Sequence, residues 1–580
     1  MAVRRGVVVV FVLIFIAMVV SLGGLLVFSM FVGAPPSVPS NATLHLPIQA
    51  PLDEIESVDV FNLLRHRPTL RETTEAIRKA KRDSRVKALV IRPATAGALW
   101  GQLQEVRAAV EDFRLSGKPV TAYLEFGGAQ EYYLATAADR IVMLPAGQLD
   151  LMGLATYEIF FKGALDKLGV YPDLLHIGDF KSASNTFTEE GFTRAHQEMS
   201  ASLNRDWYNE LVRAIADRRK KPEDEVRRII DQGPFLADQA REAGLIDALA
   251  YEDQLDDERP IAGTQRLTME TYGRVPVYDG PRALGSRIAL LYASGTIASG
   301  ASSFDGGFGN VVGSDTFAEW LRKVRVDSSI KAVVVRIDSP GGSAIASEVI
   351  WREMQLTREK LPLVVSMGDV AASGGYYIAA PAHAIVAQPG TLTGSIGVVT
   401  GKFALGEALE KLGIGTASVA DGRHAELYSP FRPFTAPERA RVTEQMRATY
   451  DLFVSRVAEG RQSTAEKIGV IAQGRVWTGH QARERGLVDE LGGLDAAIRL
   501  AKERANLDAG KAVDLVVYPR PRSVFDILAN PLGTSPTTGV AGLEQALSRD
   551  QARALGSAAN MLRIFRRGEA LLLMPNVFIR

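Results

Sequence analysis

The 580-residue sequence contains no cysteine. Disulfide bonds, thiolate metal sites and cysteine nucleophiles are therefore excluded. Histidine is scarce, with seven residues, and the sequence has no H-E-x-x-H motif, P-loop or dinucleotide-binding glycine pattern. No group of carboxylates and histidines has the spacing of metal ligands. The sequence therefore predicts neither a metal site nor a bound cofactor.

The sequence also lacks an excess of charge, because 67 Lys and Arg balance 67 Asp and Glu. Proteins that bind nucleic acids neutralise phosphates with clustered Lys and Arg, so we expect no nucleic-acid partner. Hydrophobic residues make up 46% of the chain, which is too much for a mainly disordered protein. At roughly 150 residues per domain, the length predicts more than one domain.

One segment, residues 6–32, has no charged side chain. As a helix it would be about 40 Å long, enough to cross roughly 30 Å of hydrocarbon. Arg4 and Arg5 precede it, so the positive-inside rule places residues 1–5 in the cytoplasm and the bulk of the chain outside. The alternative, a cleaved signal peptide, would have a shorter apolar region and a small-residue cleavage site. We therefore predict an uncleaved transmembrane anchor, followed by a Pro-rich spacer over residues 33–42.

The remaining sequence contains an internal repeat. Residues 83–92 (DSRVKALVIR) resemble residues 327–336 (DSSIKAVVVR), an offset of 244 positions (327 − 83). At the same offset the pair Tyr132-Tyr133 matches Tyr376-Tyr377. A repeat of this length indicates a duplicated domain, not a short solenoid repeat. We predict a first unit over residues 43–255 and a second over 286–510, with a linker at 256–285 and an extension at 511–580.

Each unit alternates β-branched runs with helical patterns. In the second unit, residues 332–337 and 363–366 are typical of buried strands, whereas 343–359 and 374–380 are typical of helices. Such alternation predicts an α/β fold with parallel sheets and crossover helices. In these sheets, ligands bind beyond the carboxyl ends of the strands.

Two glycine-rich turns follow predicted strands of the second unit, at residues 338–343 and 371–376. Small residues and free N–H groups at the start of a helix can face an oxyanion, and a neighbouring Ser373 could act as a nucleophile. The alternative is a tight structural turn capped by serine. At the 244 offset, Ala129 stands opposite Ser373, and Gly97-Ala98 stand opposite Gly341-Gly342. The first unit has therefore lost the hydroxyl while it keeps the framework.

A lysine shows the converse pattern. Lys181 of the first unit stands opposite Ala425 of the second, so one unit has the lysine without the serine and the other has the serine without the lysine. This complementary loss suggests that both units contribute to one site. A serine needs a base to become nucleophilic, and a lysine amine can be that base if burial keeps it neutral.

Ser395 belongs to the second unit alone, since its counterpart is Leu151. It could exchange a hydrogen bond with the lysine, or it could simply cap a loop. The residues by themselves leave both interpretations open.

These motifs together resemble the signal peptide peptidase A family, also called protease IV or peptidase family S49, in its long membrane-anchored bacterial form. The resemblance covers about residues 45–510 and rests on the segments 178–182, 338–342, 366–377, 391–395 and 474–479. It implies tandem crotonase/ClpP-like α/β domains and a Ser/Lys dyad protease. The implied site consists of Ser373 as nucleophile, Lys181 as general base, Ser395 orienting the lysine, and oxyanion donors from Gly374 and from Gly341 or Gly342.

The resemblance also implies partners and a location. Its substrates would be remnant signal peptides and other hydrophobic or unfolded peptides, which a serine endopeptidase hydrolyses through an acyl-enzyme. The chain would form a homo-oligomer, a tetramer in the long form, in the bacterial inner membrane with its catalytic domains on the periplasmic side.

Two other functions are compatible with such a fold. One is a catalytically inactive scaffold at the membrane surface, and the other is acyl-CoA chemistry, which the outward-facing topology disfavours. The extension after residue 510 departs from the family pattern. Its segment 562–567 and its apolar run 571–574 could form a membrane-surface helix or a packing or oligomer arm, and the run is too short to span a bilayer.

Overall fold

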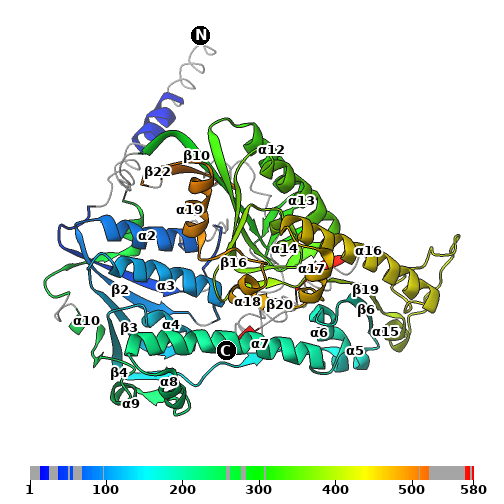
Figure 1. The fold of residues 1–580 in the computed structure, drawn as a ribbon, viewed down its shortest axis with the longest axis horizontal. Helices are drawn as coiled ribbons and strands as arrows, with labels where there is room; N and C mark the ends of the chain where they lie inside the picture. The colour runs from blue at the N-terminus through cyan, green and yellow to red at the C-terminus, as the bar shows by residue number, and fades with distance from the viewer. Residues whose placement is uncertain are drawn as a thin grey trace, which may run out of the picture.

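The computed structural model describes residues 14–24, 37–49, 52–55, 68–95, 97–255, 261–275, 282–305, 309–508, 510–520, 569–574 and 578–579. Figure 1 shows the blue and cyan elements of the first unit beside the green and orange elements of the second.

The first unit is built on a largely parallel sheet with the strand order β7-β4-β3-β2-β1-β9, in which β8 also pairs with β4. Only β7 runs antiparallel to its neighbour β4. The strands are β1 (Ala42–Gln49), β2 (Val86–Ala94), β3 (Val120–Gly128), β4 (Arg140–Asp150), β7 (Phe235–Leu236), β8 (Ala248–Leu249) and β9 (Gln265–Thr268).

The second unit repeats this arrangement as β20-β18-β16-β14-β10-β22, and off this path β17 pairs with β16 and β21 pairs with β17. Its strands are β10 (Arg282–Ser294), β14 (Ile330–Ser339), β16 (Leu363–Ala372), β17 (Ala384–Ala387), β18 (Leu392–Gly394), β20 (Val476–Thr478), β21 (Glu490–Leu491) and β22 (Ala512–Tyr518). The equivalent strands β2 and β14 hold the same place in their sheets. The predicted internal repeat and α/β architecture are thus confirmed.

Helices cover both sheets. In the first unit they are α2 (Leu70–Arg82), α3 (Trp100–Arg114), α4 (Ala129–Ala135), α5 (Lys162–Leu168), α6 (Asn185–Thr188), α7 (Arg194–Arg219), α8 (Glu223–Ile230), α9 (Ala237–Glu242), α10 (Glu252–Leu255) and α11 (Met269–Gly273). In the second they are α12 (Ser314–Val326), α13 (Ala344–Arg358), α14 (Gly374–Ala379), α15 (Gly406–Lys411), α16 (Ala436–Gly460), α17 (Ala465–Ile471), α18 (Gly479–Glu484) and α19 (Leu494–Arg504). The predicted helices at 343–359 and 374–380 correspond to α13 and α14. Ser343 caps α13, where its hydroxyl accepts a hydrogen bond from Ala346 N at 3.1 Å.

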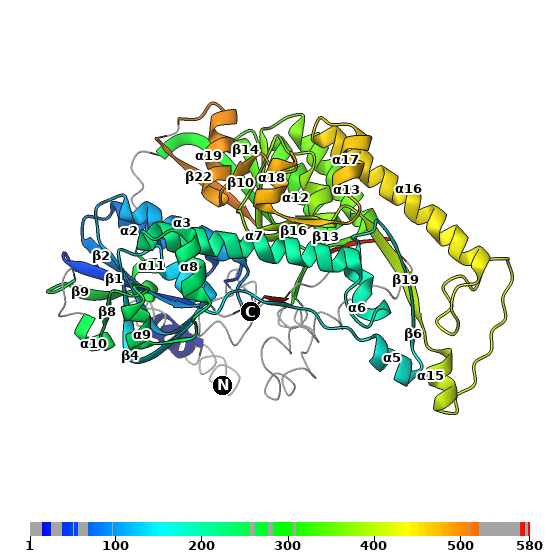
Figure 2. The same cartoon turned by 60° about the horizontal axis from the view of Figure 1, so that its bottom comes forward.

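A third sheet, which the sequence analysis did not predict, joins the two units. Its order is β12-β13-β11-β15-β23-β19-β6. The strands are β6 (Tyr171–Ile177), β11 (Thr296–Ala298), β12 (Ser303–Asp305), β13 (Gly309–Gly313), β15 (Gly341–Ser343), β19 (Val398–Ala404) and β23 (Leu571–Leu573). All seven residues of β6, from the first unit, pair antiparallel with β19 of the second. Figure 2 shows these two strands side by side.

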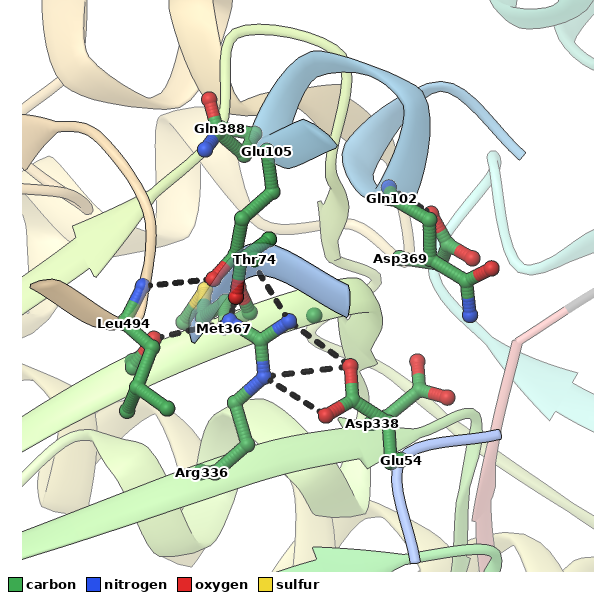
Figure 3. Close-up of polar contacts among 12 residues, drawn as sticks. Glu54, Thr74, Gln102, Glu105, Arg336, Asp338, Met367, Asp369, Gln388 and Leu494 are labelled. Atoms are coloured by element: carbon green, nitrogen blue, oxygen red, sulfur yellow. Dashed lines mark hydrogen bonds and ion pairs between the residues drawn. The ribbon is translucent and has the colours of Figure 1, made fainter. Parts of the chain in front are cut away.

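A buried ion cluster also ties the units together (Figure 3). The Arg336 guanidinium, on β14, donates to Glu54 at 2.7 Å and to Glu105 at 2.9 Å, and both carboxylates come from the first unit. Burial raises the pKa of Glu54 to about 7, although Arg336 opposes that shift. Nearby, Asp369 accepts a hydrogen bond from Gln102 N at 2.7 Å. The start of α3 is thereby fixed to the end of β16.

Both sheets include strands outside the predicted units. Strand β9 lies within the predicted linker and pairs with β1, and β22 lies within the predicted extension and pairs with β10. The apolar run at 571–574 forms strand β23, not a helix, whereas residues 562–567 lie outside the described residues. Strand β24 (Phe578–Ile579) pairs with β5 (Thr156–Tyr157).

The predicted anchor over residues 6–32 falls largely outside the described residues. Within it, residues 14–24 form a helix whose apolar side chains are exposed, for example Phe15 at 63%. Among the residues that the structure describes, no helix has the length and hydropathy needed to cross a membrane.

Candidate active site

Three of the predicted site residues meet at one buried point. The Lys181 Nζ lies within hydrogen-bond distance of three oxygens, 2.7 Å from Ser373 Oγ, 2.8 Å from the Ser395 carbonyl oxygen and 3.0 Å from Ser395 Oγ. All three side chains are 0% exposed. The serine and lysine that the sequence placed in different units therefore form one site.

Ser373 lies in the turn between β16 and α14, with φ 55° and ψ −112°. A non-glycine residue with positive φ costs on the order of 1–3 kcal/mol, so the surrounding structure must hold it. The Ser373 N–H donates to the Gly394 carbonyl at 2.8 Å, and its own carbonyl accepts from Tyr377 N at 2.8 Å. In the first unit Ala129 begins the equivalent helix α4 and Gly128 is its N-cap, so a helix starts there without a hydroxyl.

Lys181 is brought to the serine by β6 and the turn that follows it. The Lys181 N–H donates to the Gly178 carbonyl at 3.0 Å, and Phe180 N donates to the Gln473 carbonyl at 2.9 Å. A Cβ added at Gly474 would lie 2.5 Å from Lys181 Cβ. That position must therefore be glycine for the lysine to approach.

A second glycine, Gly397, lies beside the same side chain, and a Cβ there would be 3.0 Å from Lys181 Cδ. Sequence reasoning assigned no role to Gly397 and noted Gly474 only within a motif. Nothing in the sequence distinguishes these two glycines from others, and only the packing shows that a side chain at either position would collide with Lys181.

The electrostatic setting of Lys181 favours the neutral amine. Burial away from water lowers its pKa well below the ordinary value of 10.5. Its three hydrogen bonds go to uncharged oxygens, whereas the equally buried Arg336 contacts two carboxylates. A neutral amine 2.7 Å from a hydroxyl can accept its proton.

Ser395 also has a positive φ, of 50°, and follows strand β18. Its N–H donates to the Arg475 carbonyl at 2.7 Å. Its hydroxyl and its carbonyl both lie within hydrogen-bond distance of the Lys181 amine, so Ser395 makes the contact with the lysine that the sequence left open.

The three glycines of the predicted oxyanion hole lie together. A Cβ added at Gly374 would be 3.1 Å from both Gly341 Cα and Gly342 N. Gly341 and Gly342 have φ angles of 104° and 154°, which glycine adopts most readily. The Gly341 N–H donates to Ser339 Oγ at 3.2 Å. Gly342 is therefore the better placed of the two to offer an N–H group to a ligand.

Sequence reasoning missed one element of the site. Strand β23 pairs with β15, which carries Gly341 and Gly342, and with β19. The apolar run at residues 571–573 was the only signal, and nothing near it in the sequence indicated its partners.

Comparison with known proteins gives a family match. The model of peptidase family S49 matches residues 112–259 and 355–508, one segment in each unit. The chain is 34% identical to the chloroplastic serine protease SPPA of Arabidopsis thaliana, covering 83% of this chain and 71% of the relative. It is 35% identical to Protease 4 of Salmonella typhi, covering 85% and 80%. A ClpP1 mutant of Listeria monocytogenes covers 36% of this chain and 94% of its own at 14% identity, with a TM-score of 0.24, which is too low to support the predicted crotonase/ClpP-like assignment.

The buried lysine predicts a pH-dependent cost in stability. Between the lowered pKa of the folded state and 10.5, the unfolded state binds more protons, so the free energy of unfolding rises with pH. Relative to Lys181→Met, the wild type should therefore gain stability from pH 7 to pH 10. Urea unfolding at several pH values measures this, with the exposed Lys331→Met as the control that shows no such trend. A pH-independent difference between wild type and Lys181→Met would contradict the buried, neutral amine.

Proposed function

Because this chain belongs to peptidase family S49, we propose that it is a serine endopeptidase with a Ser/Lys dyad. The observation that carries the proposal is the 2.7 Å hydrogen bond between Lys181 Nζ and Ser373 Oγ inside a fully buried site. Ser373 is the nucleophile, Lys181 is the general base, and Ser395 holds the amine in position.

The reaction follows from this geometry. Ser373 Oγ attacks a peptide carbonyl carbon while its proton passes to the neutral Lys181 amine. The resulting ammonium then gives the proton to the leaving amine, and the acyl-enzyme remains on Ser373. A water molecule, activated by the same lysine, releases the acyl group and regenerates the serine.

The tetrahedral oxyanion needs fixed hydrogen-bond donors. The N–H groups of Gly374 and Gly342 supply them, since the Gly341 N–H already donates to Ser339. One such donor contributes about 10²–10³ in rate in other serine proteases. Packing of the two glycine turns against each other holds both donors before the substrate arrives.

The dyad is tested by replacing each member. Ser373→Ala and Lys181→Ala should each lower peptide hydrolysis at least about 10³-fold, because neither a nucleophile without a base nor a base without a nucleophile suffices. Lys402→Met is the matched control, since Lys402 is also buried and has a lowered pKa but donates to the Leu427 carbonyl. Near-normal hydrolysis by either dyad variant, measured with a fluorogenic apolar peptide, would refute the mechanism and favour an inactive scaffold.

We propose apolar, extended peptides as substrates, including remnant signal peptides. The apolar side chains of Leu174, Phe187 and Val399 form one cluster of β6, α6 and β19 beside the site and favour such chains. Mass spectrometry of a synthetic signal peptide should show cleavage within its apolar region, whereas a polar peptide of equal length stays intact. Equal cleavage of both peptides would contradict this substrate class.

We also propose a membrane-anchored homo-tetramer with its catalytic units on the periplasmic side. The uncharged segment 6–32 supports the anchor. Exposed apolar residues after α15, Leu412 at 75% and Val419 at 101%, support an interface. At the 244 offset, β6 of the first unit corresponds to residues 415–421 of the second unit, and these residues are exposed. In the same way, β19 of the second unit corresponds to residues 154–160 of the first unit. A neighbouring chain could pair these counterparts.

Fractionation tests the anchor and the assembly together. After alkaline extraction the protein should stay in the membrane fraction, and light scattering of the detergent-extracted protein should give four times the chain mass of 62.8 kDa. Val419→Asp should reduce that mass without releasing the protein from the membrane. Release by alkali would contradict the anchor, and a single-chain mass for the wild type would contradict the tetramer.

A further inference from the structure

The end of the chain lies against the candidate oxyanion hole. Strand β23 (Leu571–Leu573) fills the space between β15 and β19, antiparallel to both. Figure 2 shows it as a red strand beside β19. The Ala344 N–H donates to the Ala570 carbonyl at 3.1 Å, and Met574 N donates to the Pro340 carbonyl at 2.9 Å. The segment is thus held by main-chain hydrogen bonds on both sides of the glycine turn.

Further contacts fix the start of this segment. The Glu569 carbonyl accepts from Thr400 Oγ1 at 2.8 Å, and the Ser343 hydroxyl donates to the Glu569 carboxylate. Residues 569–574 therefore contact the strand with the oxyanion glycines and the strand that pairs with β6. We refer to these six residues as the tail segment.

The side chains of strand β23 enter two separate apolar clusters. Leu572 is 0% exposed and belongs to the apolar core of the second unit. Leu571 and Leu573 point to the other face and pack with Leu174 and Val399. An extended peptide alternates its side chains in this way, so the groove offers pockets for successive residues of an apolar peptide.

The main chain of Leu572 lies where a substrate carbonyl is needed. The Leu572 carbonyl oxygen and Gly374 N both approach the point that a Cβ on Gly341 would occupy, at 1.8 Å and 2.7 Å. The opposing residues Pro340 and Met574 form a hydrogen-bonded pair, and so do Ala344 and Ala570. Because such pairs alternate in an antiparallel ladder, the N–H of Gly342 faces the carbonyl of its partner Leu572.

We propose that the tail segment is a built-in substrate mimic that occupies the peptide-binding groove in the register of a substrate, with Leu572 immediately before the position of the scissile bond. This inference rests on the proposed function of Ser373 and the oxyanion glycines. A peptide that reaches these groups must align with the same edge of β15, so it must displace β23. Since the tail segment belongs to the same chain, its effective concentration is on the order of millimolar, and an external peptide competes with it.

A binding experiment tests occupancy without catalysis. The probe is a fluorescent peptide with the sequence GEALLLM, and both proteins carry Ser373→Ala so that the probe is not cut. Fluorescence anisotropy should show binding to a chain that ends at residue 568 and at least about tenfold weaker binding to the full chain. A chain that ends at residue 574 keeps the tail segment and is the matched control, which should behave as the full chain.

Equal binding of the probe to the full and shortened chains, or no binding to either, would overturn the proposal. Thermal melting of both proteins checks that the shortened chain is folded. Because Ser373 is replaced in all of them, these outcomes do not depend on whether the Ser/Lys mechanism is correct.

A substitution in the full chain provides a second, independent test. Leu572→Asp places a charge in a fully buried apolar site, which should expel the tail segment. Probe binding should then rise to the level of the shortened chain, and kcat/KM for external apolar peptides should increase about tenfold. A probe peptide with the same Leu-to-Asp change should not bind. If the Leu572→Asp chain binds the probe no better than the full chain with Leu572 does, the tail segment does not occupy the groove.

Discussion

The site depends on a single buried amine that lies among hydroxyl and carbonyl oxygens. Lys181 can serve Ser373 only if it loses its charge, and burial is the only cause that lowers its pKa. That burial needs both units, because the lysine follows a strand of the first unit and its three partners belong to the second. The pairing of β6 with β19 is thus as important to the chemistry as the serine itself.

The duplication explains why such a site exists once and not twice. Both units keep the same strand order, and both begin a helix at the turn after their third strand. Only the second unit has a hydroxyl there, and only the first has the lysine. Gly397 and Gly474 have no side chain that would collide with the Lys181 side chain. The repeated sheets provide the framework for the site. A few differences between the two units then place its serine in the second unit and its lysine in the first.

The sequence allowed the repeated sheets, α13, α14 and the three polar site residues to be predicted, because each has a local pattern or a counterpart at the 244 offset. It did not allow the third sheet to be predicted. Strands such as β15 and β23 have three residues each and pair across more than 200 positions, so no periodicity reveals them. For the same reason the apolar run at Leu571 was interpreted without its partner β15.

In the proposed mechanism, Lys181 of one unit, as a neutral amine, activates Ser373 of the other. The most direct measurement is the rate at which a fluorophosphonate labels Ser373 as a function of pH. In the wild type the rate should rise with pH through a midpoint well below 10.5, and in Lys181→Ala this rise should vanish together with most of the labelling. Identical pH profiles for the two proteins would show that Lys181 does not activate Ser373.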